Sequence, residues 1–346
     1  MAYTTINKSS EHFNTKLYTG DGSSSRNITG VGFQPDLIWF KNRDAGEYHY
    51  IFDAVRGASK AIFPNANNNE STQGTTQTAF LSDGFTVGND TASNANGQGI
   101  ASWNWKANGQ GSANTDGSIN TTYTSVNTTA GFSISKFTGT GSTATVGHGL
   151  GVAPKMIIFK NTSSDIDWRV YHESLGNTHR LCLNDDSASN DDDSAFNDTS
   201  PTSSVFTVGG SSSTNAGTMI AYCFAEKTGY SKFGSYLGNG NADGAFVYTG
   251  FKPSLIMFKS TASGTNWFML DNKRQGFNPA NETLSPNTTS VASSTGLSVN
   301  TLDFLSNGFK MKTNNAEFNA TGSTYIYMAF AEAPLVGSNN VPCTAR

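Results

Sequence analysis

The segment GFQPDLIWFK, residues 32–41, decides the fold because close variants of it recur twice, as GVAPKMIIFK at 151–160 and GFKPSLIMFK at 250–259. In each copy an aromatic residue stands 17 positions before the proline, and two glycines follow that aromatic residue. Recurrence at fixed spacing predicts tandem copies of one structural unit rather than one enzyme with one cleft. The glycine, proline and phenylalanine of the motif are Gly32, Pro35 and Phe40, then Gly151, Pro154 and Phe159, then Gly250, Pro253 and Phe258.

Further landmarks follow each proline at constant spacing. An aromatic residue or histidine comes 14 positions later and an aspartate or histidine 18 positions later: His49 and Asp53, Trp168 and His172, Trp267 and Asp271. Each copy closes on an aromatic segment, IASWNWKA at 100–107, MIAYCFAE at 219–226 and YIYMAFAE at 325–332. We therefore expect three repeat domains, at residues 1–108, 131–229 and 230–335. The Gly/Ser/Thr/Asn-rich stretch 109–130 is typical of a linker, and residues 336–346 are expected to form an extended tail.

The motif and the closing segments both predict β-strands. LIWF, MIIF and LIMF are short apolar runs behind a glycine and a proline, which is typical of strands buried on both faces. The closing segments alternate instead, so Trp103 and Trp105, Tyr222 and Phe224, and Tyr325 and Tyr327 share a face pair by pair. No helical periodicity persists. We expect an all-β chain of three tandem domains of one type, sandwich-like or jelly-roll-like, with long polar loops.

The composition narrows the range of functions. Only 14% of the residues are charged and the net charge is −4, so no basic stripe is available to neutralise the phosphates of a nucleic acid. No apolar run is long enough to span a membrane, and the N-terminus lacks a signal peptide, so we expect synthesis in a cytoplasm. Three cysteines exclude a disulfide scaffold; Cys182 and Cys223 are expected to be buried thiols or one bridge, and Cys343 a free thiol.

The polar residues that recur give no sign of a shared active site. Asp53, His172 and Asp271 differ in type, so a common acid–base role is not expected, and satisfying a nearby turn is the simpler interpretation. Lys41, Lys160 and Lys259 end the motif strands; we interpret them as solvated lysines at a strand edge, with a contact to a partner carboxylate as the alternative. We therefore expect no catalytic residue and no cofactor.

Two groups of residues could suggest a metal. His148, His172 and His179 match no ligand spacing typical of a metal site. The acidic loop at 184–193 could hold Ca²⁺, but its spacing differs from that of an EF-hand, and a solvated loop is the simpler interpretation.

Trp168 and Trp267 are the candidate binding residues. Exposed, they would stack on a sugar ring; because they recur at one fixed position, filling the core is the competing interpretation. In that case binding residues would lie in the divergent polar loops instead.

The sequence also resembles a known family. GFQPDLIWFKNRD, FDAVRGASK, LSDGFTVG and GQGIASWNWKA in the first copy, and TVGHGLGVAPKMIIFKN at 145–161, are similar to a repeat domain of uncharacterised biochemistry found in virion proteins of tailed phages, marine ones especially. The resemblance runs from about Phe13 to Arg346. In the third copy Leu270–Gly276 departs from the FDAVRG pattern. The resemblance implies a virion location and a tail-fibre, adhesin-like or other structural role, and it implies no substrate.

We therefore expect a non-enzymatic protein on the virion surface, as a tail fibre, an appendage or a capsid decoration, with other capsid or tail proteins as partners. A carbohydrate-binding module that recognises a host glycan is the alternative, and a polysaccharide depolymerase is a third. Repetition suits a spacer or a multivalent binder. By analogy with phage fibres, we expect a homo-oligomer, with a trimer favoured.

Overall fold

The computed structural model describes residues 4–262, 264–292 and 301–333. This part of the chain is nearly all β, with several antiparallel sheets, which confirms the predicted fold class. Each helix in it spans three or four residues. Cys343 and the predicted tail at 336–346 lie outside the described residues.

The first repeat is a two-sheet sandwich. Its large sheet has the order β1-β9-β3-β4 and its small sheet the order β2-β8-β7. The elements are η1 (Ser9–Glu11), β1 (Phe13–Thr19), β2 (Arg26–Thr29), β3 (Leu37–Asn42), β4 (Tyr50–Asp53), β5 (Lys60–Ala61), β6 (Ser71–Thr72), β7 (Gln77–Leu81), β8 (Gly84–Val87), α1 (Thr91–Asn94) and β9 (Gly99–Trp105).

The second repeat has the same plan, with one more strand in its large sheet and one fewer in its small sheet. Its large sheet is β10-β11-β18-β13-β14, and β12 pairs with β17 in the small sheet. The elements are β10 (Thr121–Asn127), β11 (Phe132–Thr140), β12 (Ala144–Gly147), β13 (Met156–Asn161), β14 (Arg169–His172), η2 (Glu173–Leu175), β15 (His179–Arg180), β16 (Asn190–Asp191), α2 (Asp193–Phe196), β17 (Val205–Val208), α3 (Ser212–Asn215) and β18 (Ala216–Phe224).

The third repeat returns to the plan of the first. Its large sheet is β19-β25-β21-β22 and its small sheet β20-β24-β23. The elements are β19 (Ser231–Leu237), β20 (Phe246–Tyr248), β21 (Lys252–Ser260), β22 (Trp267–Asp271), β23 (Leu302–Leu305), β24 (Gly308–Met311), α4 (Ala316–Asn319) and β25 (Thr324–Ala333).

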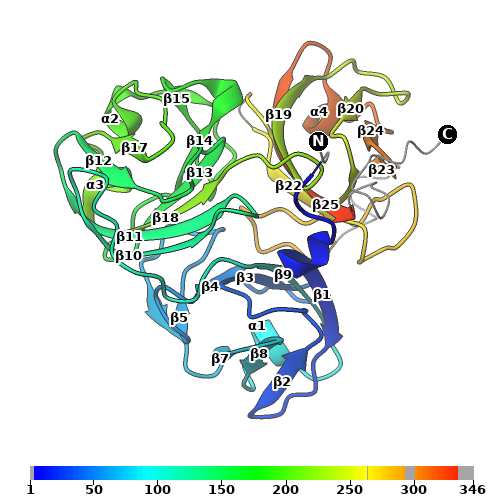
Figure 1. Cartoon of the computed structure of the whole chain (residues 1–346). Helices are drawn as coiled ribbons and strands as arrows, with labels where there is room; N and C mark the ends of the chain where they lie inside the picture. The colour runs from blue at the N-terminus through cyan, green and yellow to red at the C-terminus, as the bar shows by residue number, and fades with distance from the viewer. Residues whose placement is uncertain (1–3, 263, 293–300, 334–346) are drawn as a thin grey trace.

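The three repeats lie around a common centre and share a core there (Figure 1). One face of each large sheet packs on its own small sheet, which gives three separate apolar clusters. The opposite faces meet in one larger cluster that takes Trp103, Tyr222 and Met328 from the three closing strands. The motif strands β3 and β13 are buried along their whole length, as predicted, because apolar residues are needed on both of their faces. The repeats therefore form one body rather than a string of beads.

The paired glycines upstream of the motif have a steric cause. A Cβ at Gly20 would lie 2.1 Å from the carbonyl oxygen of Ala95, and the equivalent Gly238 meets Ala320 at 2.2 Å. The second glycine of the pair, Gly22, has φ +69°, a conformation that other residues rarely adopt. The glycines thus let each repeat's first loop cross directly over its last short helix.

The prediction of a linker at 109–130 is wrong for part of its length. Residues 121–127 form β10, which pairs antiparallel with β11 as the outermost strand of the second repeat's large sheet. Ile119 lies buried in that repeat's own apolar cluster. The composition misled because the segment makes a ladder through its backbone and needs few apolar side chains to do so.

Each pair of aromatic residues in the closing strands shares one face, as predicted, but the three pairs do not all take the same face. Trp103 and Trp105, like Tyr222 and Phe224, face the common centre. Tyr325 and Tyr327 share a face, but it is the opposite one, toward their own small sheet. In the third repeat the central positions are taken by Ile326, Met328 and Phe330. The strand register explains this, because Met328, and not Tyr327, is the residue of β25 that corresponds to Tyr222.

Candidate functional site

The three lysines at the ends of the motif strands are buried rather than solvated. Lys41 donates from Nζ to the carbonyls of Ala45, Glu47 and, in the third repeat, Thr289. The other two lysines also donate to a backbone carbonyl of the preceding repeat. Lys160 reaches Asn67 of the first repeat at 3.0 Å, and Lys259 reaches Asp186 of the second repeat at 3.5 Å.

Burial lowers the pKa of each of these lysines to about 8. The interpretation as strand-edge lysines is therefore wrong: each lysine ties its own repeat to the preceding one, and the series closes into a ring. Lysine is rarely fully buried unless its charge is satisfied, which is why the sequence favours a solvated one; here backbone carbonyls satisfy the charge.

The two candidate tryptophans take part in a second ring of contacts. Trp168 is fully buried and Trp267 is 1% exposed, so neither can stack on a sugar, and the binding role predicted for them is wrong. Trp168 Nε1 donates to the carbonyls of Phe63 and Ala66 in the first repeat, and Trp267 Nε1 donates to Cys182 O in the second. The third position of this ring is His49, which is also fully buried; its Nδ1 accepts the Trp39 Nε1–H at 3.0 Å, and it faces the backbone of Ser285 in the third repeat without a hydrogen bond from Nε2 to any described residue.

Asp53 and Asp271 hold the third ring of contacts. Asp53 Oδ2 lies 2.5 Å from Arg56 Nε and accepts a hydrogen bond from the Tyr222 hydroxyl of the second repeat at 2.7 Å. Asp271 repeats this arrangement with Arg274, at 2.6 Å, and with Trp103 Nε1 of the first repeat, at 3.2 Å. Each aspartate also accepts the backbone N–H of its arginine, so it does satisfy a turn as predicted. Its bond to another repeat was not predicted.

His172 completes that ring with different chemistry. Its Nδ1 accepts the N–H of Ser174, so Nε2 carries the proton and donates to the Tyr327 carbonyl of the third repeat at 3.1 Å. Burial lowers its pKa to about 4. The arginine three positions on is replaced by Leu175, and the hydrogen-bonding Tyr222 by Met328.

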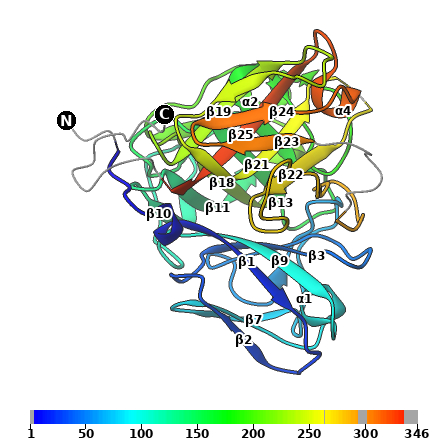
Figure 2. The same cartoon turned by 90° about the vertical axis from the view of Figure 1, so that its right-hand side faces the viewer.

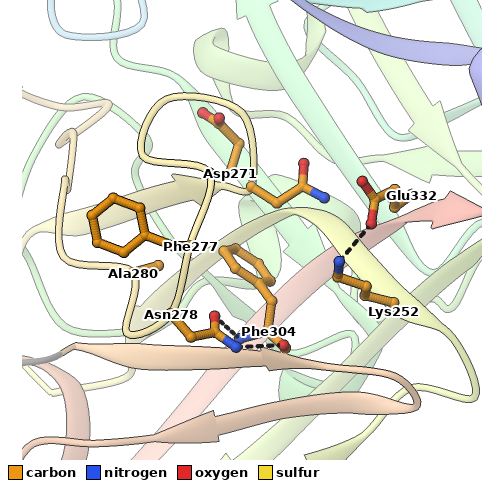
Figure 3. Close-up of a pocket in the computed structure, with 9 residues that line it drawn as sticks. Lys252, Asp271, Phe277, Asn278, Ala280, Phe304 and Glu332 are labelled. Atoms are coloured by element: carbon orange, nitrogen blue, oxygen red, sulfur yellow. Dashed lines mark hydrogen bonds and ion pairs between the residues drawn. The ribbon is translucent and has the colours of Figure 1, made fainter.

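A surface pocket of about 260 Å³ lies beside the turn after β22 in the third repeat (Figure 3). Phe277 stands at its rim with 67% of its surface exposed. On the other side Lys252 and Lys273 pair with Glu332 at 2.8 and 3.4 Å. Burial acts to raise the pKa of Glu332, but the two lysines outweigh it and the pKa is lowered.

Asn278 and Asp271, two further polar groups of this pocket, are already paired. The Asn278 side chain donates to the carbonyl of Phe304 and accepts its N–H. Asp271 is held by Arg274 and by two backbone amides, so it is poorly placed to move a proton. The arrangement suits contact with a polar ligand at the rim better than acid–base chemistry.

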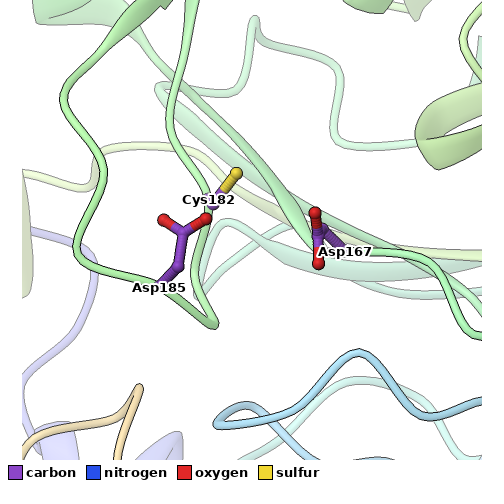
Figure 4. A group of neighbouring side chains, drawn as sticks. All are labelled: Asp167, Cys182 and Asp185. Carbon is purple, nitrogen blue, oxygen red and sulfur yellow. The ribbon is translucent and has the colours of Figure 1, made fainter.

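The described residues bring three metal-ligating side chains together at Asp167, Cys182 and Asp185 (Figure 4). The Cys182 thiol, however, already accepts hydrogen bonds from Arg169 at 3.0 Å and Arg180 at 3.1 Å. Two guanidinium groups beside the sulfur repel a cation, and burial raises the pKa of the thiol to about 11. This group is therefore a poor metal site.

The other candidate metal ligands from the sequence do not form a site. His148 bonds to the Thr202 carbonyl, whereas His172 bonds to the Tyr327 carbonyl of the third repeat. In the acidic loop at 185–193, Asp192 pairs with Arg180 at 3.0 Å, and Asp185 accepts the N–H of Ser187. Cys182 and Cys223 are both free and buried, so the buried-thiol interpretation is the one that holds.

Comparison with known families gives a match over most of the chain. The family described as Domain of unknown function (DUF7483) matches residues 8–334. The chain belongs to this family. The matched region includes all three repeats, so the family is defined by the whole three-lobed unit. No curated protein and no solved structure matches the chain. No helix in the described part of this DUF7483 member is long and apolar enough to cross a membrane.

Proposed function

We propose that this protein is a non-enzymatic structural component on the outside of a tailed-phage particle, as a tail fibre, an appendage or a capsid decoration. One observation carries the structural role: the polar residues that recur between the repeats, which a shared activity would use, are buried and bonded across the repeat interfaces. The assignment to a virion rests on the sequence resemblance. Other capsid or tail proteins are the expected partners, and a homo-oligomer, with a trimer favoured, remains a prediction.

The direct test is the protein content of purified particles. Phage encoding this chain is purified on a density gradient, and the particles are analysed by mass spectrometry and by immunogold labelling with an antibody to the folded chain. The proposal expects the chain at a fixed copy number per particle and gold on the particle surface. A chain that is abundant in the infected-cell lysate but missing from gradient-purified particles would contradict it.

A second candidate, recognition of a host glycan, is favoured by the pocket beside Phe277. An aromatic ring that is 67% exposed, next to a charged rim, is a suitable platform for a sugar. Binding to host-surface polysaccharide is measured for the wild type, for Phe277→Ala, and for Tyr248→Ala as a control at an exposed ring elsewhere. Selective loss in Phe277→Ala supports this candidate; equal binding by all three proteins, or none by the wild type, removes it.

A further inference from the structure

The first repeat has an open groove where its two sheets meet. The groove has a volume of about 450 Å³ and is lined by residues 16–19 of β1 and 26–29 of β2. β1 is the end strand of the large sheet and β2 the end strand of the small sheet, so both present an unpaired edge (Figure 2). Within the described ranges, no strand pairs with the outer edge of β1. Such an edge is a template for another strand.

In the second repeat the chain itself fills the equivalent groove. β10 adds to the edge of β11, the counterpart of β1. Upstream of β10, Ile119 donates its N–H to the Thr145 carbonyl of β12 at 2.9 Å and buries its side chain between the sheets. The molecule thus shows how this groove is occupied: one strand pairs with the large sheet and an aliphatic residue plugs the gap between the sheets.

The backbone of β1 is arranged to accept such a strand. The Lys106 N–H donates to the His12 carbonyl, and pairing with β9 alternates from there, so the amides of Thr15 and Leu17 point away from β9. In the second repeat the Ala225 N–H donates to the Gly131 carbonyl, and the pairing of β11 with β18 alternates from there in the same way. The two edges therefore offer donors and acceptors in the same register.

The charge of the groove differs between the two repeats. The strand registers show which positions are equivalent. Lys16, opposite Ser102, corresponds to Ser135, opposite Ala221. Arg26, opposite Val87, corresponds to Ala144, opposite Val208. Two cations in the first repeat therefore stand where the second has a serine and an alanine.

Neither cation is held by a close ion pair. Arg26 lies 3.5 Å from Asp21, stands over the Tyr18 ring and donates from Nη1 to the Thr19 carbonyl of β1 at 2.5 Å. Lys16 makes no ion pair within the described chain; the nearby Asp83 instead accepts the amides of Gly30 and Gly32. An edge lysine discourages pairing with neutral or basic strands, so it selects for an acidic one.

We propose that the groove between β1 and β2 binds an extended segment of a partner polypeptide, which adds to β1 as a strand. The segment carries an aliphatic residue at the place of Ile119 and a carboxylate opposite Lys16. Thr124 marks that second place, because its Oγ1 contacts Ser135, the counterpart of Lys16, at 3.5 Å. The inference stands independently of the virion assignment, because it rests on the comparison of two repeats.

The probe is a fluorescent peptide with the sequence of residues 110–127 and Thr124→Glu, added to the full chain. Binding is followed by anisotropy and its place by hydrogen exchange. We expect protection at residues 13–19 and at least a tenfold loss of affinity when the amides at positions 123 and 125 are N-methylated, because those face β11 in the second repeat. N-methylation at position 126, whose amide points away from β11, is the control and should leave most of the affinity; position 124 is left unmethylated because its amide donates to Ser112 within the probe's own sequence.

A charge exchange tests the predicted chemistry. The peptide with Thr124→Glu should bind the wild type about two- to fivefold more tightly than a peptide with Thr124→Lys, and Lys16→Glu in the full chain should reverse that order. Circular dichroism establishes that Lys16→Glu is folded. No binding to the wild type, protection that excludes β1, or equal loss from both N-methylated peptides would overturn the proposal. Binding that arises only in a variant ending at Ala333 would also overturn it, because the chain's own residues 334–346 would then be the occupant.

Discussion

Two interfaces between repeats can be compared at one equivalent position, which is Asp53 where the first repeat meets the second and His172 where the second meets the third. The first interface places a charged side chain there and the second a neutral one. In the first, Asp53 is buried with Arg56 and bonds the Tyr222 hydroxyl across the interface. In the second, the equivalent His172 bonds a backbone carbonyl instead. The neighbours have changed together: Arg56 corresponds to Leu175, and Tyr222 to Met328. A buried anion needs a cation, whereas a neutral imidazole needs only one acceptor and one donor, which here are the Tyr327 carbonyl and the Ser174 N–H.

The largest effect is expected from breaking the charged interface. Asp53→Ala leaves the buried Tyr222 hydroxyl without its partner and leaves Arg56 with only the more distant, partly exposed Glu70, at 3.3 Å, so the free energy of unfolding should fall by about 3–5 kcal/mol. Urea denaturation measures the loss.

The matched variant transfers the second interface into the first. Asp53→His, Arg56→Leu and Tyr222→Met together remove the charge and its partners at once. The triple variant should recover most of the stability that Asp53→Ala loses. A triple variant as unstable as the single one would show that the two interfaces are not interchangeable.

A smaller effect is expected at the lysine ring. Lys160→Met removes the donor of two partly buried hydrogen bonds, to the carbonyls of Asn67 and Ile166, so about 1–3 kcal/mol should be lost. Lys155→Met is the control, because Lys155 pairs with Glu173 at the surface and should change stability by less than about 1 kcal/mol. Equal stability of the two variants in urea would mean that the buried lysine does not tie the repeats together.

The smallest effect is expected at the interface that contains His172, where the free energy of unfolding should fall as the pH is lowered. The folded pKa of His172 is about 4, below its ordinary value, so the unfolded chain binds the extra proton first and stability is lost as pH falls from about 6.5 toward 4. Protonation of Nδ1 would also end its bond from Ser174. At pH 5.5 His172 should account for about 1 kcal/mol of lost stability.

His172→Gln should lose about 1 kcal/mol less stability than the wild type between pH 7 and 5.5, as measured by urea midpoints. His148→Gln, at a histidine outside the ring of contacts, should retain the share of the loss that His172 causes. If the pH dependence of His172→Gln matches that of the wild type, the other buried histidines account for all of it.

The sequence predicted the repeated unit, the all-β class and the motif strands, because apolar runs behind Gly and Pro depend on local pattern. It did not predict the rings of contacts, because Lys41, Trp168 and Asp53 each find their partner in another repeat. Recurrence itself was the overlooked signal: a solvated lysine has no reason to return at a fixed position three times. The Asp–Arg pair was also visible, since Asp271 and Arg274 keep the spacing of Asp53 and Arg56 even where the rest of the turn departs from FDAVRG.

The central claim is that the repeats form one cooperative body around a shared core and three closed rings of contacts. Scanning calorimetry of the intact chain tests it most directly. We predict one transition whose calorimetric and van't Hoff enthalpies agree, because no repeat can unfold without exposing the core and the buried polar groups of the other two. Two or three separable transitions, or a calorimetric enthalpy about three times the van't Hoff value, would contradict it and show that the repeats are independent domains.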